Sequence, residues 1–150
     1  MSTQERDVTA RIAYADSCLR AFRWHVRELE RCQREYAELT YELEAALVSS
    51  PRIKSPEEAL YRSSPAYHTG GLSDKIMQIL DDRDERQADY DHALMELHRI
   101  GRFLRRLSSE DVELIAMRYE YGMAYESIGA ALSYSRQAAC KKIHKILAQW

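Results

Sequence analysis

Residues 108–150 read SSEDVELIAMRYEYGMAYESIGAALSYSRQAACKKIHKILAQW, and this stretch decides the fold of the C-terminal third of the chain. Ser108 is well placed to cap a first helix, and Gly122 is placed to end it. A second short helix is predicted from Ala124 to Leu132, and Ser135 is the expected N-cap of a third. The spacing therefore predicts three short helices in close succession.

The second and third helices must cross closely, because only about three residues join them. A small residue is needed where they touch, and Gly129 supplies it. Ala139, Ile143 and Ile146 recur at helical spacing and are expected to face inward. The expected core partners on the neighbouring helices and turn are Leu114, Ile115, Ile128, Leu132 and Tyr134. This pattern is typical of a helix-turn-helix unit.

The third helix carries the residue types that are typical of a DNA-recognition helix. No acidic residue follows Glu126, whereas four arginine and lysine residues do. Arginine can bond guanine through two hydrogen bonds and glutamine can bond adenine in the same way, while lysine more often meets phosphate. The predicted DNA-binding residues are Ser135, Arg136, Gln137, Lys141, Lys142 and Lys145.

The same stretch resembles region 4 of sigma factors and, more closely, phage transcriptional activators of the ArpU and RinA type. The resemblance implies a bacterial or prophage regulator that binds promoter double-stranded DNA and activates phage or mobile-element genes, with RNA polymerase as a further candidate partner. Two residues depart from the family pattern. Ser133 replaces a turn glycine, so either it adopts a mildly unfavourable backbone conformation or the turn differs, and Ala124 replaces a capping Ser or Thr. The matching residues are Arg118, Tyr119, Gly122, Tyr125 to Gly129, Leu132, Tyr134 and Ser135.

The remainder of the chain predicts an all-α protein with two long helices before this domain. Residues 1–47 are expected to form one long helix from about Val8, residues 48–72 a flexible connector, and residues 73–107 a second helix capped by Ser73. Residues 108–150 are the helix-turn-helix domain. The long helices are expected to form a coiled coil or a helical hairpin.

A heptad seam follows the first long helix, formed by Val8, Ile12, Ala15, Leu19, Phe22, Val26 and Leu29. Beyond Leu29 two registers compete: one continues through Gln33 and Thr40, and the other, after a stutter, uses Cys32 and Leu39. The seam is suited to packing within the chain or to self-association. We expect a homodimer, because helix-turn-helix proteins commonly bind paired half-sites.

Composition bounds the remaining possibilities. No apolar run is long enough to cross a membrane and no signal peptide is recognisable, so a cytoplasmic location in a bacterial host cell is expected, without a membrane partner. Cys18, Cys32 and Cys140 show no metal-ligand spacing and are expected to be reduced thiols. No nucleophile–base pair or phosphate-binding loop is present, so we expect no enzyme, cofactor, metal or small-molecule substrate.

Two interpretations stay open at the level of sequence. Residues 108–150 could instead be a protein-interaction module that binds RNA polymerase or a sigma factor without touching DNA. A second basic group, formed by Arg102, Arg105 and Arg106, is explained either by the dipole at a helix C-terminus or by contact with phosphate.

Overall fold

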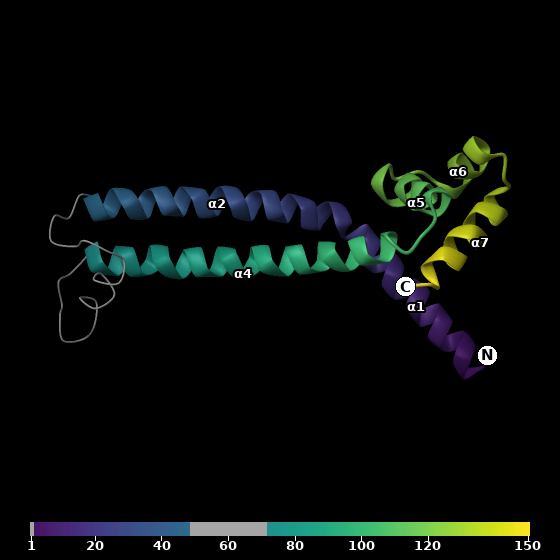
Figure 1. Cartoon of the computed structure of the whole chain (residues 1–150), viewed down its shortest axis with the longest axis horizontal. Helices are drawn as coiled ribbons and strands as arrows, with labels where there is room; N and C mark the ends of the chain where they lie inside the picture. Colours follow the sequence, from purple (N-terminus) through teal and green to yellow (C-terminus); the bar gives the residue numbers. More distant parts are fainter. Residues whose placement is uncertain (1, 49–71) are drawn as a thin grey trace. The chain divides into compact units, whose positions relative to one another are not determined.

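The computed structural model describes residues 2–48 and 72–150, and it is all-helical, with no strand in either range (Figure 1). The predicted connector, residues 48–72, lies outside the described residues except at its two ends, Val48 and Leu72, which are helical. The elements in order are α1 (Thr3–Arg20), α2 (Phe22–Val48), α4 (Leu72–Leu104), α5 (Ser109–Ile115), a π-helical turn η1 (Ala116–Glu120), α6 (Tyr125–Leu132) and α7 (Arg136–Leu147).

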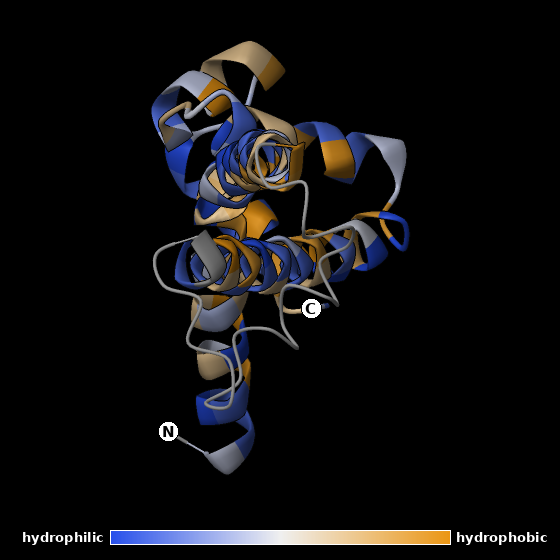
Figure 2. Cartoon of the chain, turned by 90° about the vertical axis from the view of Figure 1, so that its left-hand side faces the viewer, coloured by the Kyte–Doolittle hydropathy of each residue, from blue (hydrophilic) through white to orange (hydrophobic). Residues whose placement is uncertain are grey.

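The chain forms two compact units. Unit 1 comprises Met1–Val26 and Met95–Trp150, and unit 2 comprises Arg27–Leu94. Helices α2 and α4 each contribute residues to both units. Hydrophilic residues in blue and hydrophobic residues in orange are interspersed on the helices, as expected of amphipathic helices (Figure 2).

The first long helix differs from its prediction at its start and near its middle. It begins at Thr3 rather than near Val8, because Ser2 and Glu5 form a capping box. The Ser2 hydroxyl accepts from the Glu5 backbone N–H at 3.3 Å, and the Glu5 carboxylate accepts from the Ser2 backbone N–H at 2.7 Å. The helix is then divided into α1 and α2 at Ala21. No proline or glycine lies there, so the usual sequence signal of a kink is missing.

The second long helix begins and ends slightly earlier than expected. It starts at Leu72, which places Ser73 within the helix rather than at its cap, and it ends at Leu104 rather than at residue 107. Backbone hydrogen bonds of a tight turn close this end, from Arg105 N–H to Gly101 O at 3.1 Å and from Arg106 N–H to Phe103 O at 3.0 Å.

Along α2 in unit 2, burial decides between the two predicted registers. Cys32, Leu43 and Ala46 are buried, whereas Gln33 of the uninterrupted heptad is exposed. The buried face therefore follows the register after the stutter.

Within unit 2, α2 and α4 pack as an antiparallel pair within one chain. Leu43 and Ala46 from the end of α2 form an apolar cluster with Ile76 and Ile79 from the start of α4. Farther from this cluster, Glu35 of α2 meets α4 through an ion pair. The helical hairpin, rather than an interchain coiled coil, thus uses the apolar face of this segment.

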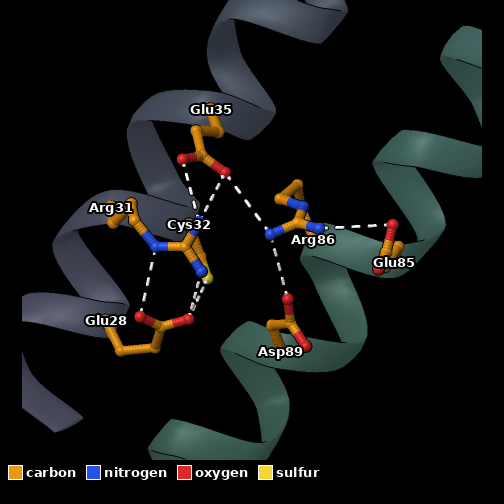
Figure 3. Close-up of polar contacts among 7 residues, drawn as sticks. All are labelled: Glu28, Arg31, Cys32, Glu35, Glu85, Arg86 and Asp89. Atoms are coloured by element: carbon orange, nitrogen blue, oxygen red, sulfur yellow. Dashed lines mark hydrogen bonds and ion pairs between the residues drawn. The ribbon is translucent and has the colours of Figure 1, made fainter.

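A layer of charged side chains joins α2 to the part of α4 that carries the charged run DDRDERQAD, residues 81–89 (Figure 3). The Arg86 guanidinium lies 3.5 Å from a Glu35 carboxylate oxygen and 3.1 Å from one of Asp89. Arg31 lies 3.0 Å from the other Glu35 oxygen and also pairs with Glu28. Charged side chains with matched partners therefore join α2 to α4 in this part of the hairpin.

Three residues in this layer are the only described group whose chemistry could suit a metal ion. The candidate ligand atoms of Glu28, Cys32 and Asp89 lie within 4.8 Å of one another. Both carboxylates, however, already bind the guanidiniums of Arg31 and Arg86. Burial and the neighbouring Glu28 carboxylate raise the pKa of the Cys32 thiol, which favours a neutral side chain. The group is best explained as part of the ion-pair layer.

A single apolar core holds unit 1 together. It draws buried residues from α1, the last turns of α4 and the three C-terminal helices, so α1 packs against the C-terminal segment. The buried members are Ala15, Leu19, Ile100, Phe103, Leu114, Ile115, Ile128, Ala139, Ile143, Ile146 and Leu147.

A polar contact between α1 and the π-helical turn accompanies this core. The Tyr119 hydroxyl donates to Asp16 Oδ1 at 2.7 Å, and Arg20 donates to Asp16 Oδ2 at 2.6 Å. Partial burial opposes ionisation of Asp16, but the bonds from Arg20 and Tyr119 outweigh it and lower the pKa of the carboxyl. Burial and the bond to Asp16 raise the pKa of Tyr119, which stays a neutral donor.

We predict that Asp16→Asn destabilises unit 1 by about 1–3 kcal/mol at neutral pH, because two hydrogen bonds to a charged acceptor are weakened. The lowered pKa of Asp16 means that its stabilisation is complete above the unfolded value of 3.8 and is lost as pH falls through the lower folded value. The wild type should therefore lose this advantage over the variant in acid.

Urea unfolding followed by tryptophan fluorescence measures this effect in unit 1, because Trp24 and Trp150 both lie there. Asp7→Asn, on the same helix at an exposed position, is the matched control. Equal stability of the Asp16 and Asp7 variants at neutral pH would contradict the role given to Asp16.

Candidate nucleic-acid interface

The first C-terminal helix begins as predicted but ends differently. The Ser108 hydroxyl accepts from the Asp111 backbone N–H at 3.2 Å, which confirms Ser108 as the N-cap of α5. The α-helix stops at Ile115, and a π-helical turn from Ala116 to Glu120 follows before Gly122 reverses the chain with φ of +67°. One extra residue is thus accommodated in the last turn, which the apolar spacing alone did not indicate.

Arg118 fixes the loop that follows this turn. Its Nη1 donates to the Met123 carbonyl at 2.9 Å, and its guanidinium lies 4.4 Å from the centre of the Tyr125 ring. Arg118 therefore connects the π-helical turn to the start of α6. An arginine followed by an aromatic residue seven positions later was the only sequence signal for this contact.

Three residues, Ser133 to Ser135, join α6 to α7, as predicted. Ser133 is left-handed, with φ of 60° and ψ of 33°, so of the two alternatives the unfavourable backbone conformation is confirmed. The Ser135 hydroxyl accepts from the Ala138 backbone N–H at 3.1 Å and caps α7. Ala124 precedes α6 without a side-chain cap.

Gly129 lies where α6 meets this turn. A Cβ atom built on it would lie 2.6 Å from the Tyr134 carbonyl oxygen and 3.2 Å from the carbonyl carbon of Ser135. Both are backbone atoms and cannot move aside as a flexible side chain could. Gly129 is also buried, and its carbonyl accepts from the Tyr134 N–H at 2.7 Å. The need for a small residue at position 129 is confirmed, and the backbone that it meets is that of the turn and of the N-cap of α7.

The inward face of α7 is also confirmed, with one correction in the turn. Ala139, Ile143 and Ile146 are buried, but Tyr134, which we expected in the core, is 44% exposed. Its carbonyl rather than its ring faces Gly129, so the backbone occupies the interior position and the ring points outward.

The first turn of α7 presents two of the predicted base-reading side chains to solvent. Arg136 and Gln137 are exposed. Arg136 Nε lies 2.9 Å from a Glu126 oxygen, but the two side chains are 70% and 59% exposed, so this pair contributes little stability. Ser135 is exposed as well, with its hydroxyl used by the cap.

The three predicted lysines lie together in a surface groove that also includes one acidic residue, Asp111. Gln137, Lys141 and Lys145 are four residues apart and therefore form one row along the exposed face of α7. The groove is lined by Asp111, Lys141, Lys142, Lys145, Ile146 and Gln149.

Lys142 has a partner that the sequence did not indicate. Its ammonium nitrogen lies 5.3 Å from the centre of the exposed Tyr134 ring, a cation–π distance. The ring holds the lysine against the turn and is itself an exposed aromatic beside the basic row. Tyr134 is therefore a candidate member of the exposed interface. The sequence did not indicate this role, because the apolar ring of a tyrosine favours a place in the core.

Comparison with known proteins gives no match: no protein-family model, curated protein or solved structure is significantly similar to the chain. Among the helices that the structure describes, none is both long enough and apolar enough to cross a membrane.

We predict opposite effects of alanine at two glycines of unit 1. Gly129→Ala should destabilise the fold by about 1–3 kcal/mol, because the new methyl meets backbone that cannot yield. Gly101→Ala should stabilise it by about 0.5–1 kcal/mol, because Gly101 lies inside α4 and an added methyl would meet nothing within 4 Å.

Thermal or urea unfolding of the two variants makes the comparison. If both glycines tolerate alanine equally, the close approach of α6 to the turn is not a constraint on this fold.

Proposed function

We propose that the chain binds double-stranded DNA in a sequence-specific manner, with α6 and α7 as a helix-turn-helix and α7 as the recognition helix. The observation that carries this proposal is the exposed row of Gln137, Lys141 and Lys145 on a helix whose opposite face is buried. No acidic residue occurs anywhere on α7 or after it. A single helix with this division fits a major groove about 12 Å wide.

The start of α7 is suited to base contacts and its later turns to phosphate contacts. Arg136 and Gln137 lie beside the capped N-terminus, the end of a recognition helix that approaches base edges. Lys141 and Lys145 lie one and two turns farther along, where an ammonium group would neutralise phosphate. The cation–π contact restricts Lys142 near the turn, which lowers the entropy lost when it meets an anion.

The resemblance to sigma region 4 and to phage activators extends this proposal to transcription regulation, with activation of phage or mobile-element genes as the expected outcome. RNA polymerase is the further partner that the resemblance implies. A homodimer remains a prediction, but buried seam residues such as Ala15, Leu19 and Cys32 pack within the chain. An interface between two copies would therefore have to use other residues.

Removing the lysine row should weaken binding to all duplexes alike. The slope of log K for DNA binding against log[salt] measures the number of phosphate contacts, and each contact contributes about 0.9 to its magnitude. We expect the triple variant Lys141→Ala, Lys142→Ala, Lys145→Ala to lower this magnitude by about 2–3. Fluorescence anisotropy with a random-sequence duplex of about 30 base pairs, between ~50 and ~200 mM salt, gives the slope.

The control for a nonspecific loss of three charges is Arg23→Gln, Arg27→Gln, Arg34→Gln, at exposed arginines of α2. A lysine variant that binds as tightly as this control, with the same slope, would exclude α7 as the DNA-binding element.

Arg136 should act on sequence preference rather than on general affinity. We expect Arg136→Ala to reduce discrimination among duplexes enriched from a random library by about 1–3 kcal/mol at one position. Because Glu126 would then face DNA without its partner, the double variant Arg136→Ala, Glu126→Gln is needed to separate lost base contact from new repulsion.

Restoration of wild-type preference by the second change would mean that Arg136 only neutralises Glu126. If the wild type binds no duplex at low salt yet co-purifies with RNA polymerase or a sigma factor, the protein-interaction alternative is correct.

A further inference from the structure

A second basic groove lies in unit 1, at the C-terminal end of α4. Its floor is aromatic: Phe103 is buried, and the Trp150 ring packs on it with the ring centres 4.7 Å apart. Arg102, Arg105 and Arg106 are exposed around this floor. The full lining is Arg99, Arg102, Phe103, Arg105, Arg106 and Trp150, which we call the arginine groove.

The dipole of α4 does not account for this concentration of charge. The last carbonyls of the helix already accept backbone hydrogen bonds, at Gly101, Phe103 and Leu104, and need no side-chain donor. The dipole interaction also falls off within the last turn of the helix, so it does not extend to Arg99.

Internal ion pairing does not account for it either. Arg99 lies 3.7 Å from Glu96 and donates to the Tyr14 hydroxyl, so it has partners. No acidic residue lines the groove within the part of the chain that the structure describes. Clustered guanidiniums repel one another unless an anion is supplied, so the groove is electrostatically suited to an anionic ligand.

The arginine groove adjoins the lysine groove of α7. Gln149 lines the lysine groove and Trp150, the next residue, lines the arginine groove. Gln149 also continues the row of Lys141 and Lys145 at four-residue spacing, and its side chain reaches the Lys145 carbonyl at 3.5 Å. The two basic grooves of unit 1 thus meet at consecutive residues of the chain, Gln149 and Trp150.

We propose that the arginine groove is a second phosphate-binding surface, which holds the DNA backbone beside the segment that α7 contacts. The proposal rests on the DNA-binding function proposed above. Duplex DNA carries one charge per about 1.7 Å of its axis, so two basic grooves on the same unit are suited to meet several phosphates of one duplex. Guanidinium is the appropriate group, because its fork can bond two phosphate oxygens at once.

The arginine groove would also add affinity for DNA to that of the recognition helix α7. The exposed part of α7 offers few base-reading side chains, and the backbone contacts of the arginine groove would fix its position and orientation on the duplex.

The test is the triple variant Arg102→Gln, Arg105→Gln, Arg106→Gln, which removes the charge and keeps an uncharged polar side chain at each position. Its control is Arg23→Gln, Arg27→Gln, Arg34→Gln, which removes the same charge from exposed arginines of α2 outside both grooves. Anisotropy with the random-sequence duplex of about 30 base pairs should show a slope lower by about 2–3 and roughly tenfold or greater loss of affinity at low salt, relative to this control.

A lysine version of the same triple variant keeps the charge and should recover most of the slope, which separates phosphate binding from damage to the fold. Tryptophan fluorescence checks folding directly, because Trp150 lies in the groove.

The outcomes distinguish this inference from the function on which it rests. If the lysine-row variant loses affinity but the arginine variant matches its control, the arginine groove is not a DNA surface and the function of α7 stands. If the wild type binds no duplex, both proposals are overturned. If the lysine version binds as weakly as the glutamine version, charge is not what the groove contributes.

Discussion

The close approach between Gly129 and the backbone of Tyr134 and Ser135 is the constraint on which the C-terminal structure depends. With only three residues between α6 and α7, the turn must pass directly over α6, and any side chain at position 129 would occupy the space of a carbonyl. The same approach imposes the left-handed conformation of Ser133 and turns the Tyr134 ring outward. Burial of Ala139 and Ile143 on one face of α7 then leaves its basic side chains on the other. The chemistry of the proposed interface is thus a consequence of backbone packing.

The two units use different means to join their helices. Unit 1 has one apolar core with a polar contact at Asp16, whereas unit 2 combines a small apolar cluster with a layer of arginine–carboxylate pairs. Replacing an apolar seam by matched charges adds little stability, but it penalises any register in which the charges lose their partners. Arg83 also joins α4 to α2. Its Nε is buried, and its Nη2 donates to the Tyr36 hydroxyl at 2.6 Å.

A local signal in the sequence is sufficient to predict a structural feature when the backbone there requires one type of residue. The caps at Ser108 and Ser135, the small residue at Gly129 and the strained Ser133 all belong to this class, and all are confirmed. Apolar periodicity likewise predicts an all-helical chain.

Features that depend on tertiary partners cannot be predicted in the same way. The division at Ala21 has no proline or glycine to mark it, and the π-helical turn is set by how Arg118 and Tyr119 meet α6 and α1. The sequence also does not tell whether the ring or the carbonyl of Tyr134 fills the crossing. The charges of the DDRDERQAD run suggest a solvated face, although Arg83 and Arg86 of that run contact α2.

The buried crossing, the exposed basic face on α7 and the arginine groove together make up the DNA-binding surface that we propose on unit 1. The most direct measurement of this claim is the change in backbone amide NMR shifts when the ¹⁵N-labelled chain is titrated with duplex DNA. The largest changes should fall on Ser135 to Lys145, with smaller ones at Arg102 to Arg106. Shift changes confined to unit 2, or none at low salt, would contradict it.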